Sequence, residues 1–201
     1  MASYNISDKA LDFERGCIVD LDLETGLSMK LDTGKRMLSQ MKGMFADDKA
    51  FDEIIEKKGD QLVYEFHSMP VPDHAGDLAF GCSIVYPGKV GDEYYFTKGH
   101  FHVVLDTCEV YYCLKGHGYM LCESPEGDWE AFEMCPGQAV YVPKRYAHRS
   151  INVSPNETLV TYYVFRADAG HDYGTIETKG YRKLLVDRKG VPTIIDNPKW
   201  K

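Results

Sequence analysis

The sequence predicts a mainly β protein built around a small antiparallel barrel, and three observations lead to this fold class. Between residues 61 and 165 the chain consists of short segments rich in β-branched and aromatic residues. Turn residues separate these segments, for example Pro87–Gly88 and Pro136–Gly137. Apolar residues at helical spacing are found mainly in residues 35–58. Many short strands with frequent turns are typical of a β-sandwich or barrel.

The composition fits one globular domain and argues against a membrane protein. The 201 residues are 44% hydrophobic and 27% charged, values typical of a globular chain that is long enough to bury a core. No apolar run approaches the roughly 18 residues that a membrane span needs. Residues 1–16 lack the basic and apolar parts of a signal peptide. We therefore expect a cytoplasmic protein with no membrane partner.

The charge and the cysteines exclude two further classes of site. The formal net charge is −8, and the lysines and arginines are scattered singly or in pairs. Nucleic acid is therefore not expected as a partner, because it requires a concentrated basic surface. An anionic small molecule is compatible with this charge if local donors bind it. The six cysteines include no C-x-x-C pair, which argues against a zinc knuckle or a thioredoxin-type site.

The first 60 residues are expected to form two short strands and two helices. The strands would be residues 17–23 and 27–31, on either side of a turn. Residues 35–44 carry apolar side chains at helical spacing. A second helix is expected from Asp47 or Asp48 to Lys58, ended by Gly59. The two helices would form a small appendage, residues 35–58, in front of the barrel.

The barrel itself is expected from about residue 61 to residue 166. Its predicted strands are residues 61–67, 78–86, 94–102, 109–115, 119–124, 129–134, 139–143, 149–152 and 158–165. A C-terminal segment, residues 167–201, would follow and end in a hairpin of residues 183–187 and 192–196. The chain has no repeats or linkers, so we expect residues 1–201 to form a single domain.

One stretch, residues 97–112, carries the chemistry that we expect of this protein. His100 and His102 are two positions apart, so in an extended strand both imidazoles point to the same face. Glu109 opens the next strand on an interior face, where a carboxylate is costly unless it is paired or binds a cation. With His148, these residues are expected to hold one metal ion inside the barrel. The alternative is a pair of solvated loop histidines and a surface glutamate.

At these residues the sequence resembles the cupin superfamily, whose motifs are G-x5-H-x-H-x3–4-E-x6-G and G-x5-P-x-G-x2-H-x3-N. The second motif is matched by Gly137, Pro143, His148 and Asn152. Two departures are that six residues separate the second histidine of the first motif from its glutamate, and that Arg145 replaces a glycine. The longer gap resembles the cupin-type glucose-6-phosphate isomerases best known from archaea.

That closer resemblance extends over about residues 20–200. The segments that carry it are YPGKVG (86–91), TKGHFH (97–102), EVYY (109–112), AHR (147–149), ADAGHDYGTI (167–176) and DNPKW (196–200). It implies a cupin, or double-stranded β-helix (jelly-roll), barrel. It also implies that the metal ligands are His100, His102, Glu109 and His148. The sugar-phosphate site that it implies consists of Tyr64, Ser83, Thr97, Gly99, Tyr111, His171 and Tyr173.

The residue types at these positions agree with that implication, because hydroxyls and backbone N–H groups suit phosphate oxygens. Ordinary strand packing would explain the same residue types. Lys98 would join the site only if the turn keeps the strand register. Phe165 stands where the family is expected to have a tyrosine, with Tyr162 and Tyr163 as alternative hydroxyls. The remaining histidines are expected to face solvent; they are His67, His74 and His117.

The resemblance implies a metal-dependent interconversion of glucose 6-phosphate and fructose 6-phosphate, reactions of glycolysis and gluconeogenesis. A cis-enediolate route would use Glu109 as the base, with Tyr111 and His171 as further catalytic residues, and a hydride shift is the competing route. One divalent transition metal per chain is expected, Fe²⁺ first, with Mn, Ni, Co or Zn as alternatives. A homodimer is also implied.

Two other functions remain open at this stage. One is a different metal-dependent cupin enzyme, either a mannose-phosphate isomerase or an oxygenase. The other is a non-catalytic sugar-binding cupin. An oxygenase would consume O2, whereas an isomerase would work without it.

Overall fold

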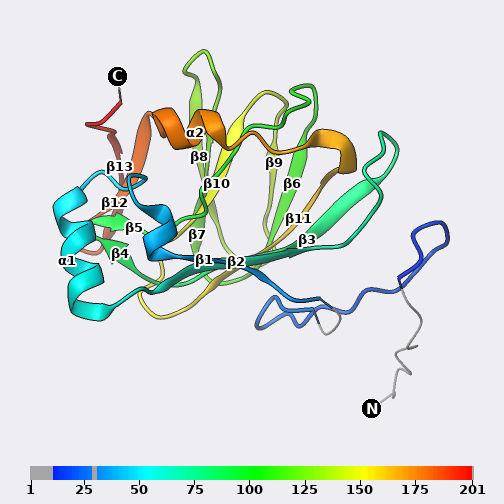
Figure 1. The fold of residues 1–201 in the computed structure, drawn as a ribbon, viewed down its shortest axis with the longest axis horizontal. Helices are drawn as coiled ribbons and strands as arrows, with labels where there is room; N and C mark the ends of the chain where they lie inside the picture. The colour runs from blue at the N-terminus through cyan, green and yellow to red at the C-terminus, as the bar shows by residue number, and fades with distance from the viewer. Residues whose placement is uncertain (1–10, 29–30, 201) are drawn as a thin grey trace.

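Antiparallel strands make up most of the protein, whose computed structural model describes residues 11–28 and 31–200 (Figure 1). The largest sheet has the order β1–β2–β3–β11–β6–β9. Its strands are β1 (Gly34–Met37), β2 (Leu62–Ser68), β3 (Leu78–Val85), β11 (Leu159–Arg166), β6 (Glu109–Lys115) and β9 (Ala139–Val142). A second sheet contains, in spatial order, β10 (Ala147–Asn152), β7 (Gly118–Glu123) and β8 (Trp129–Met134).

A third sheet and a few short helices complete the described chain. The sheet contains, in spatial order, β13 (Val191–Asp196), β12 (Lys183–Arg188), β5 (Glu93–Tyr94) and β4 (Lys89–Val90). The helices are the 3₁₀ turn η1 (Leu38–Met41), α1 (Asp48–Lys58), the 3₁₀ turn η2 (Ala167–Ala169) and α2 (Gly174–Lys179). The mainly β fold and the cupin-type barrel predicted from the sequence are confirmed, with α1 beside the third sheet (Figure 1).

Residues 95–101 follow β5 of the third sheet and pair with β10 of the second sheet through isolated bridges. This pairing places His100 next to His148. Isolated antiparallel bridges pair Phe96 with Ile151 and His100 with His148. Between them, Thr97 N donates to Ser150 O at 2.9 Å. The continuous strand predicted over residues 94–102 is therefore wrong beyond Tyr94. The residues that follow form only isolated bridges, and Gly99 at φ 75° interrupts the extended conformation between the bridges at Phe96 and His100.

Strand alternation places the chemistry of β6 inside the barrel. Glu109, Tyr111 and Cys113 are buried, whereas Val110 and Tyr112 between them are 39% and 41% exposed. This is the alternation that a strand with one buried face requires. The predicted interior position of Glu109 is thus found in the structure.

The helix predicted over residues 35–44 is wrong. Residues 34–37 form β1, which pairs with β2 so that Arg36 lies opposite Tyr64, and only residues 38–41 turn as η1. Pairing with the edge of the large sheet satisfies the backbone of β1 and overrides the local apolar spacing. The second predicted helix is confirmed as α1, with Asp47 as its N-cap and Gly59 at its C-terminus.

The N-terminal strands predicted at residues 17–23 and 27–31 reduce to one bridge, between Leu21 and Ser28. Residues 29–30 lie outside the described residues. The loop between the bridged residues is held by His67 of β2, whose Nε2 lies 2.7 Å from Gly26 O. His67 is 2% exposed, so the expectation that it faces solvent is wrong. His74 is exposed as expected, and the side chain of His117 is 41% exposed.

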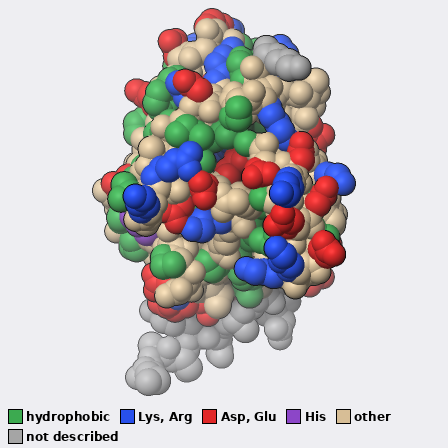
Figure 2. All heavy atoms as spheres, turned by 90° about the vertical axis from the view of Figure 1, so that its left-hand side faces the viewer, with side chains coloured by type: hydrophobic (Ala, Val, Ile, Leu, Met, Phe, Trp, Pro, Cys, Tyr) green, Lys and Arg blue, Asp and Glu red, His purple; other side chains and the backbone are tan. Residues whose placement is uncertain are grey.

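Figure 2 shows the face of the protein that carries α1 and the third sheet, where acidic and basic side chains are interspersed without a continuous basic patch. Ion pairs at these elements join Lys89 with Asp187, Arg188 with Asp92, and Lys199 with Asp48. This face lacks the concentrated positive charge that nucleic-acid binding requires. None of the helices formed by the described residues is long and apolar enough to cross a membrane.

Replacing Asp47 by alanine is expected to lower the free energy of unfolding by about 1 kcal/mol. The carboxylate accepts a hydrogen bond from Ala50 N at 2.9 Å and so pairs a free N–H group at the start of α1. Urea denaturation followed by circular dichroism measures the loss.

Asp52→Ala is the matched control for this variant. The Asp52 side chain is 68% exposed and lies 3.5 Å from Lys42, so its loss should cost less than about 0.5 kcal/mol. Equal losses in the two variants would contradict the capping role of Asp47.

Candidate active site

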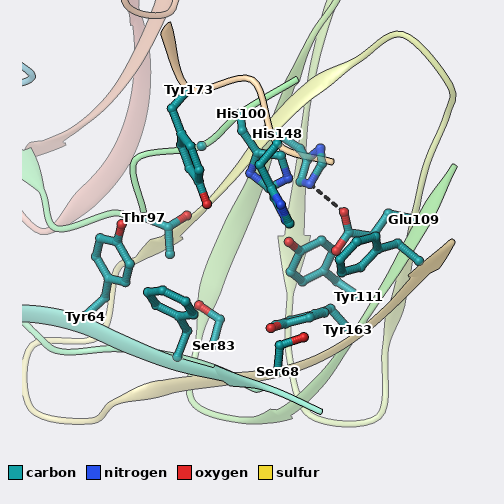
Figure 3. Close-up of a pocket in the computed structure, with 14 residues that line it drawn as sticks. Tyr64, Ser68, Ser83, Thr97, His100, Glu109, Tyr111, His148, Tyr163 and Tyr173 are labelled. Carbon is teal, nitrogen blue, oxygen red and sulfur yellow. Dashed lines mark ion pairs between the residues drawn. The ribbon is translucent and has the colours of Figure 1, made fainter. Parts of the chain in front are cut away.

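Four polar side chains converge inside the barrel from three separate parts of the chain. His100 and His102 come from the connection before β6, Glu109 from the start of β6, and His148 from β10. One potential ligand atom from each residue lies within 4.8 Å of the others. All four are buried, with exposed fractions of 9% or less. Figure 3 shows the rings of His100 and His148 beside the Glu109 carboxylate.

The orientation of two of these imidazoles is fixed by hydrogen bonds on the side away from Glu109. The Thr107 hydroxyl donates to Val104 O, so it accepts from His102 Nδ1 at 2.7 Å. His148 Nδ1 lies 3.3 Å from the carbonyl of Tyr146, where it donates. In its neutral form each ring therefore carries its proton on Nδ1 and presents the lone pair of Nε2 to the cluster.

These lone pairs point at a carboxylate oxygen rather than at a hydrogen-bond donor. Glu109 Oε2 lies 3.1 Å from His102 Nε2 and 2.8 Å from His148 Nε2. His100 Nε2 and His148 Nε2 are buried and have no hydrogen-bond partner in the structure. A cation bound by all four residues would remove the repulsion and satisfy the unpartnered nitrogens. This buried group of three histidines and a glutamate thus has the donor set to bind a metal ion.

The protonation of the group suits ligation. Burial raises the pKa of the Glu109 carboxyl, but the positive charge of a protonated His148 and hydrogen bonds from His102 and His148 outweigh burial and hold the pKa below its ordinary value. A bound cation would supply the same positive charge beside neutral imidazoles. Burial, reinforced by His148, lowers the pKa of His100 well below its ordinary value. The carboxylate is therefore ionised and the His100 ring neutral, which are the forms that bind metals.

A pocket of about 210 Å³ opens onto the cluster. The residues that line it are Tyr64, Phe66, Ser68, Ser83, Thr97, Gly99, His100, Glu109, Tyr111, His148, Tyr163, Phe165, His171 and Tyr173. All seven residues expected at the sugar-phosphate site are among them. His102 is not in the lining and lies behind Glu109 and Phe165, its ring stacked on Phe165 at 5.7 Å.

The pocket has two chemically different ends (Figure 3). Glu109 and Tyr111 lie at one end, and Tyr64 and Thr97 lie at the other. At the second end the Thr97 hydroxyl accepts from Ser150 N at 3.1 Å, which holds the turn that contains Gly99. A buried hydroxyl without a partner, that of Ser83, also lines the pocket. A ligand with several oxygens can satisfy such donors.

Residues 35–201 match the protein family described as glucose-6-phosphate isomerase (GPI). The chain belongs to this family. The glucose-6-phosphate isomerase of Pyrococcus furiosus is 46% identical over 183 residues, which cover 91% of this chain and 96% of the relative. That of Thermococcus kodakarensis is 44% identical over 191 residues, or 95% of this chain and all of the relative. The membership predicted from the sequence motifs is confirmed, and with it the prediction of an isomerase of this family.

Solved structures with a similar fold include oxalate oxidase in complex with the substrate analogue glycolate. Its TM-score is 0.47 at 11% sequence identity, and the match covers 57% of this chain and 56% of that chain.

Two residues that the sequence offered as possible site residues, Lys98 and Tyr162, do not line the pocket of this glucose-6-phosphate isomerase family member. Lys98 points away from the pocket lining and pairs with Glu177 of α2 at 2.6 Å. Tyr162 lies on the opposite face of β11, where its ring packs against Phe80 at 6.2 Å. The register of β11 instead brings Tyr163 into the pocket, where its hydroxyl donates to His67 O at 2.9 Å.

Phe165 gives the pocket an apolar wall at the position where the family resemblance led us to expect a tyrosine. Its ring stacks on His102 and lies edge-on to His171 at a centroid distance of 5.3 Å. Phe66 and Ser68 were not anticipated as pocket residues. They follow Tyr64 on β2 at two-residue steps, so strand alternation from Tyr64 was the signal that identifies them.

Gly99→Ala is expected to lower the free energy of unfolding more than Gly43→Ala does. Both glycines have positive φ, 75° and 83°, so an added Cβ costs about 1–2 kcal/mol at either position. Only at Gly99 would the Cβ clash, with Tyr181 Oη at 2.3 Å and His148 O at 2.8 Å. Overpacking of this kind adds about 1–3 kcal/mol.

Gly43 is the matched control because a Cβ there meets no atom within 4 Å. Urea denaturation of the two variants gives the comparison. Equal losses would mean that the turn at Gly99 moves away from its neighbours without cost.

Proposed function

We propose that this protein interconverts glucose 6-phosphate and fructose 6-phosphate, with one divalent transition metal bound by His100, His102, Glu109 and His148. The observation that carries the proposal is the set of unpartnered imidazole nitrogens facing a buried carboxylate at the end of a pocket. Membership of the isomerase family supports the substrate. The metal, when bound, would polarise the carbonyl and hydroxyl oxygens of the open-chain sugar.

The residues at this end of the pocket suit a reaction that moves hydrogen between neighbouring carbons. The Glu109 carboxylate has one face toward the pocket, so it is placed to accept a proton from the substrate. Burial, with the charge of Glu109, raises the pKa of Tyr111 well above its ordinary value. Its phenol therefore stays protonated and can donate a hydrogen bond to a sugar oxygen.

His171 and Tyr173 line the pocket beside His100. Their rings stack at 5.8 Å, and the ring of His171 lies 4.4 Å from that of His100. Burial lowers the pKa of His171, so its imidazole is neutral and can exchange a proton with a sugar hydroxyl. Aromatic walls, Phe66 and Phe165 among them, would limit the water that reaches the reacting carbons.

The other end of the pocket suits the phosphate group. Hydroxyl groups of Tyr64, Ser83 and Thr97 line it, together with the backbone turn at Gly99. Burial raises the pKa of Tyr64 to about 12, so its phenol stays protonated and available as a donor. Fe²⁺ as the native metal, a homodimer and a cytoplasmic location stay predictions from the sequence within this proposal.

Removal of metal is expected to abolish turnover of fructose 6-phosphate. Product formation can be followed with an NADP-dependent glucose-6-phosphate dehydrogenase, before and after treatment with EDTA. Fe²⁺ or Mn²⁺ added in excess should restore the rate, because the donor set accepts several divalent metals.

Turnover in the absence of O2 and the rate with mannose 6-phosphate are measured in parallel. Full activity without metal would contradict metal dependence. Failure of the metal-loaded protein to act on fructose 6-phosphate would contradict the isomerase proposal, and O2 consumption would favour an oxygenase.

Thr107→Val is expected to weaken binding of the divalent metal about 10- to 100-fold. The variant removes the hydroxyl that accepts from His102 Nδ1 at 2.7 Å, so the ring loses its fixed tautomer and orientation. Calorimetric titration of metal-free protein with Mn²⁺ measures the affinity. Thr107→Ser keeps the hydroxyl and should bind as the original protein does; a similar loss in both variants would argue against this orienting bond.

A further inference from the structure

Arg36 is a half-buried cation on the pocket side of the large sheet. In the pairing of β1 with β2 it lies directly opposite Tyr64, and directly opposed residues project to the same face. Tyr64 lines the pocket. The guanidinium lies 5.4 Å from the ring centroid of Phe66, a second pocket residue two positions further along β2. The cation is thus next to the Tyr64 end of the pocket.

The donors of Arg36 are only partly used. One N–H group donates to the carbonyl of Lys35 at 2.9 Å, and the guanidinium also hydrogen-bonds the Tyr64 phenol. A guanidinium has five N–H groups, so donors remain for a ligand. Among the residues that the structure describes, no carboxylate forms an ion pair with Arg36, whereas its neighbour Lys35 lies 4.0 Å from Glu65. A half-buried guanidinium without an anionic partner, beside a pocket, is suited to an anionic ligand.

No other unpaired basic side chain of the described residues lies at the Tyr64 end of the pocket. No lysine or arginine is among the described residues that line it. Lys98 belongs to the turn at residues 97–99, but its ammonium group forms an ion pair with Glu177 at 2.6 Å. The chain as a whole carries a formal charge of −8, which disfavours an anionic substrate. The attraction for a phosphate must therefore come from local groups.

The positive charge of Arg36 affects the pKa of two phenols that line the pocket. Burial raises the pKa of Tyr64 and of Tyr173, and the guanidinium opposes that rise at both phenols. Arg36 thus acts on two side chains that come from different parts of the chain and meet at the pocket.

We propose that Arg36 binds the phosphate group of the substrate and sets the preference for phosphorylated sugars. The inference rests on the proposed isomerase function for the identity of the substrate. The phosphate would lie between the guanidinium, the Tyr64 hydroxyl and the Thr97–Gly99 turn. Its sugar carbons would then extend toward Glu109, at the opposite end of the pocket (Figure 3).

Arg36→Met tests this role, since it keeps an apolar stem over Phe66 and removes the charge. The KM for fructose 6-phosphate and the inhibition constant of inorganic phosphate should both rise about 10- to 100-fold, the usual effect of losing a charged hydrogen bond. The kcat should change little, because phosphate binding is the same in the ground and transition states. Arg36→Lys should recover part of the affinity as a point charge.

Lys35→Met is the matched control, because it removes the same charge from the adjacent, outward-facing position of β1. Its KM and phosphate inhibition should equal those of the original protein. Melting temperature and bound metal are measured for every variant. If Arg36→Met does not fold, Arg36→Gln takes its place in the same comparison.

Unchanged phosphate inhibition in the Arg36 variant would overturn the inference, as would an equal loss in Lys35→Met. A lower melting temperature with unchanged phosphate affinity would mean that Arg36 only packs on Phe66. If the original protein does not isomerise fructose 6-phosphate, the proposed function fails. Calorimetric titration with inorganic phosphate then still decides whether Arg36 binds that anion.

Discussion

The buried carboxylate of Glu109 is the constraint on which the candidate site depends. An ionised side chain that is 2% exposed must be compensated by groups around it. Here the compensation comes from imidazoles that the fold supplies from two other segments, and Thr107 and the Tyr146 carbonyl orient two of them. When these imidazoles are neutral, their Nε2 atoms face the carboxylate oxygen, an arrangement that a bound cation stabilises and that protein groups alone leave unsatisfied.

The pocket separates two kinds of recognition along its length. The Glu109 end offers an anionic cluster with a protonated phenol beside it, and the Tyr64 end offers neutral hydroxyls and backbone N–H groups. Arg36 adds positive charge beside the second end although the whole chain is acidic. A substrate with a carbonyl at one terminus and a phosphate at the other would be held in a single orientation by this polarity.

Pairing between strands, rather than local sequence, decided the elements around the site. Residues 34–37 have apolar neighbours at helical spacing, yet they pair with β2, and this pairing brings Arg36 opposite Tyr64. Residues 95–101 read as a continuous strand, yet Gly99 turns the chain so that His100 bridges His148. In both cases the backbone hydrogen bonds of a distant segment overrode the local propensity.

The β architecture, the family and the four residues of the buried cluster could be predicted from the sequence, because alternation along a strand and motif spacing are local properties. The resemblance to the family supplied the seven residues expected at the sugar-phosphate site; all of them line the pocket, and their role in binding stays a prediction. Three features could be seen only in three dimensions: Tyr163 rather than Tyr162 enters the pocket, His67 is buried, and Arg36 lies beside Tyr64. Each of these depends on register between strands far apart in the chain, and no short stretch of sequence specifies that register.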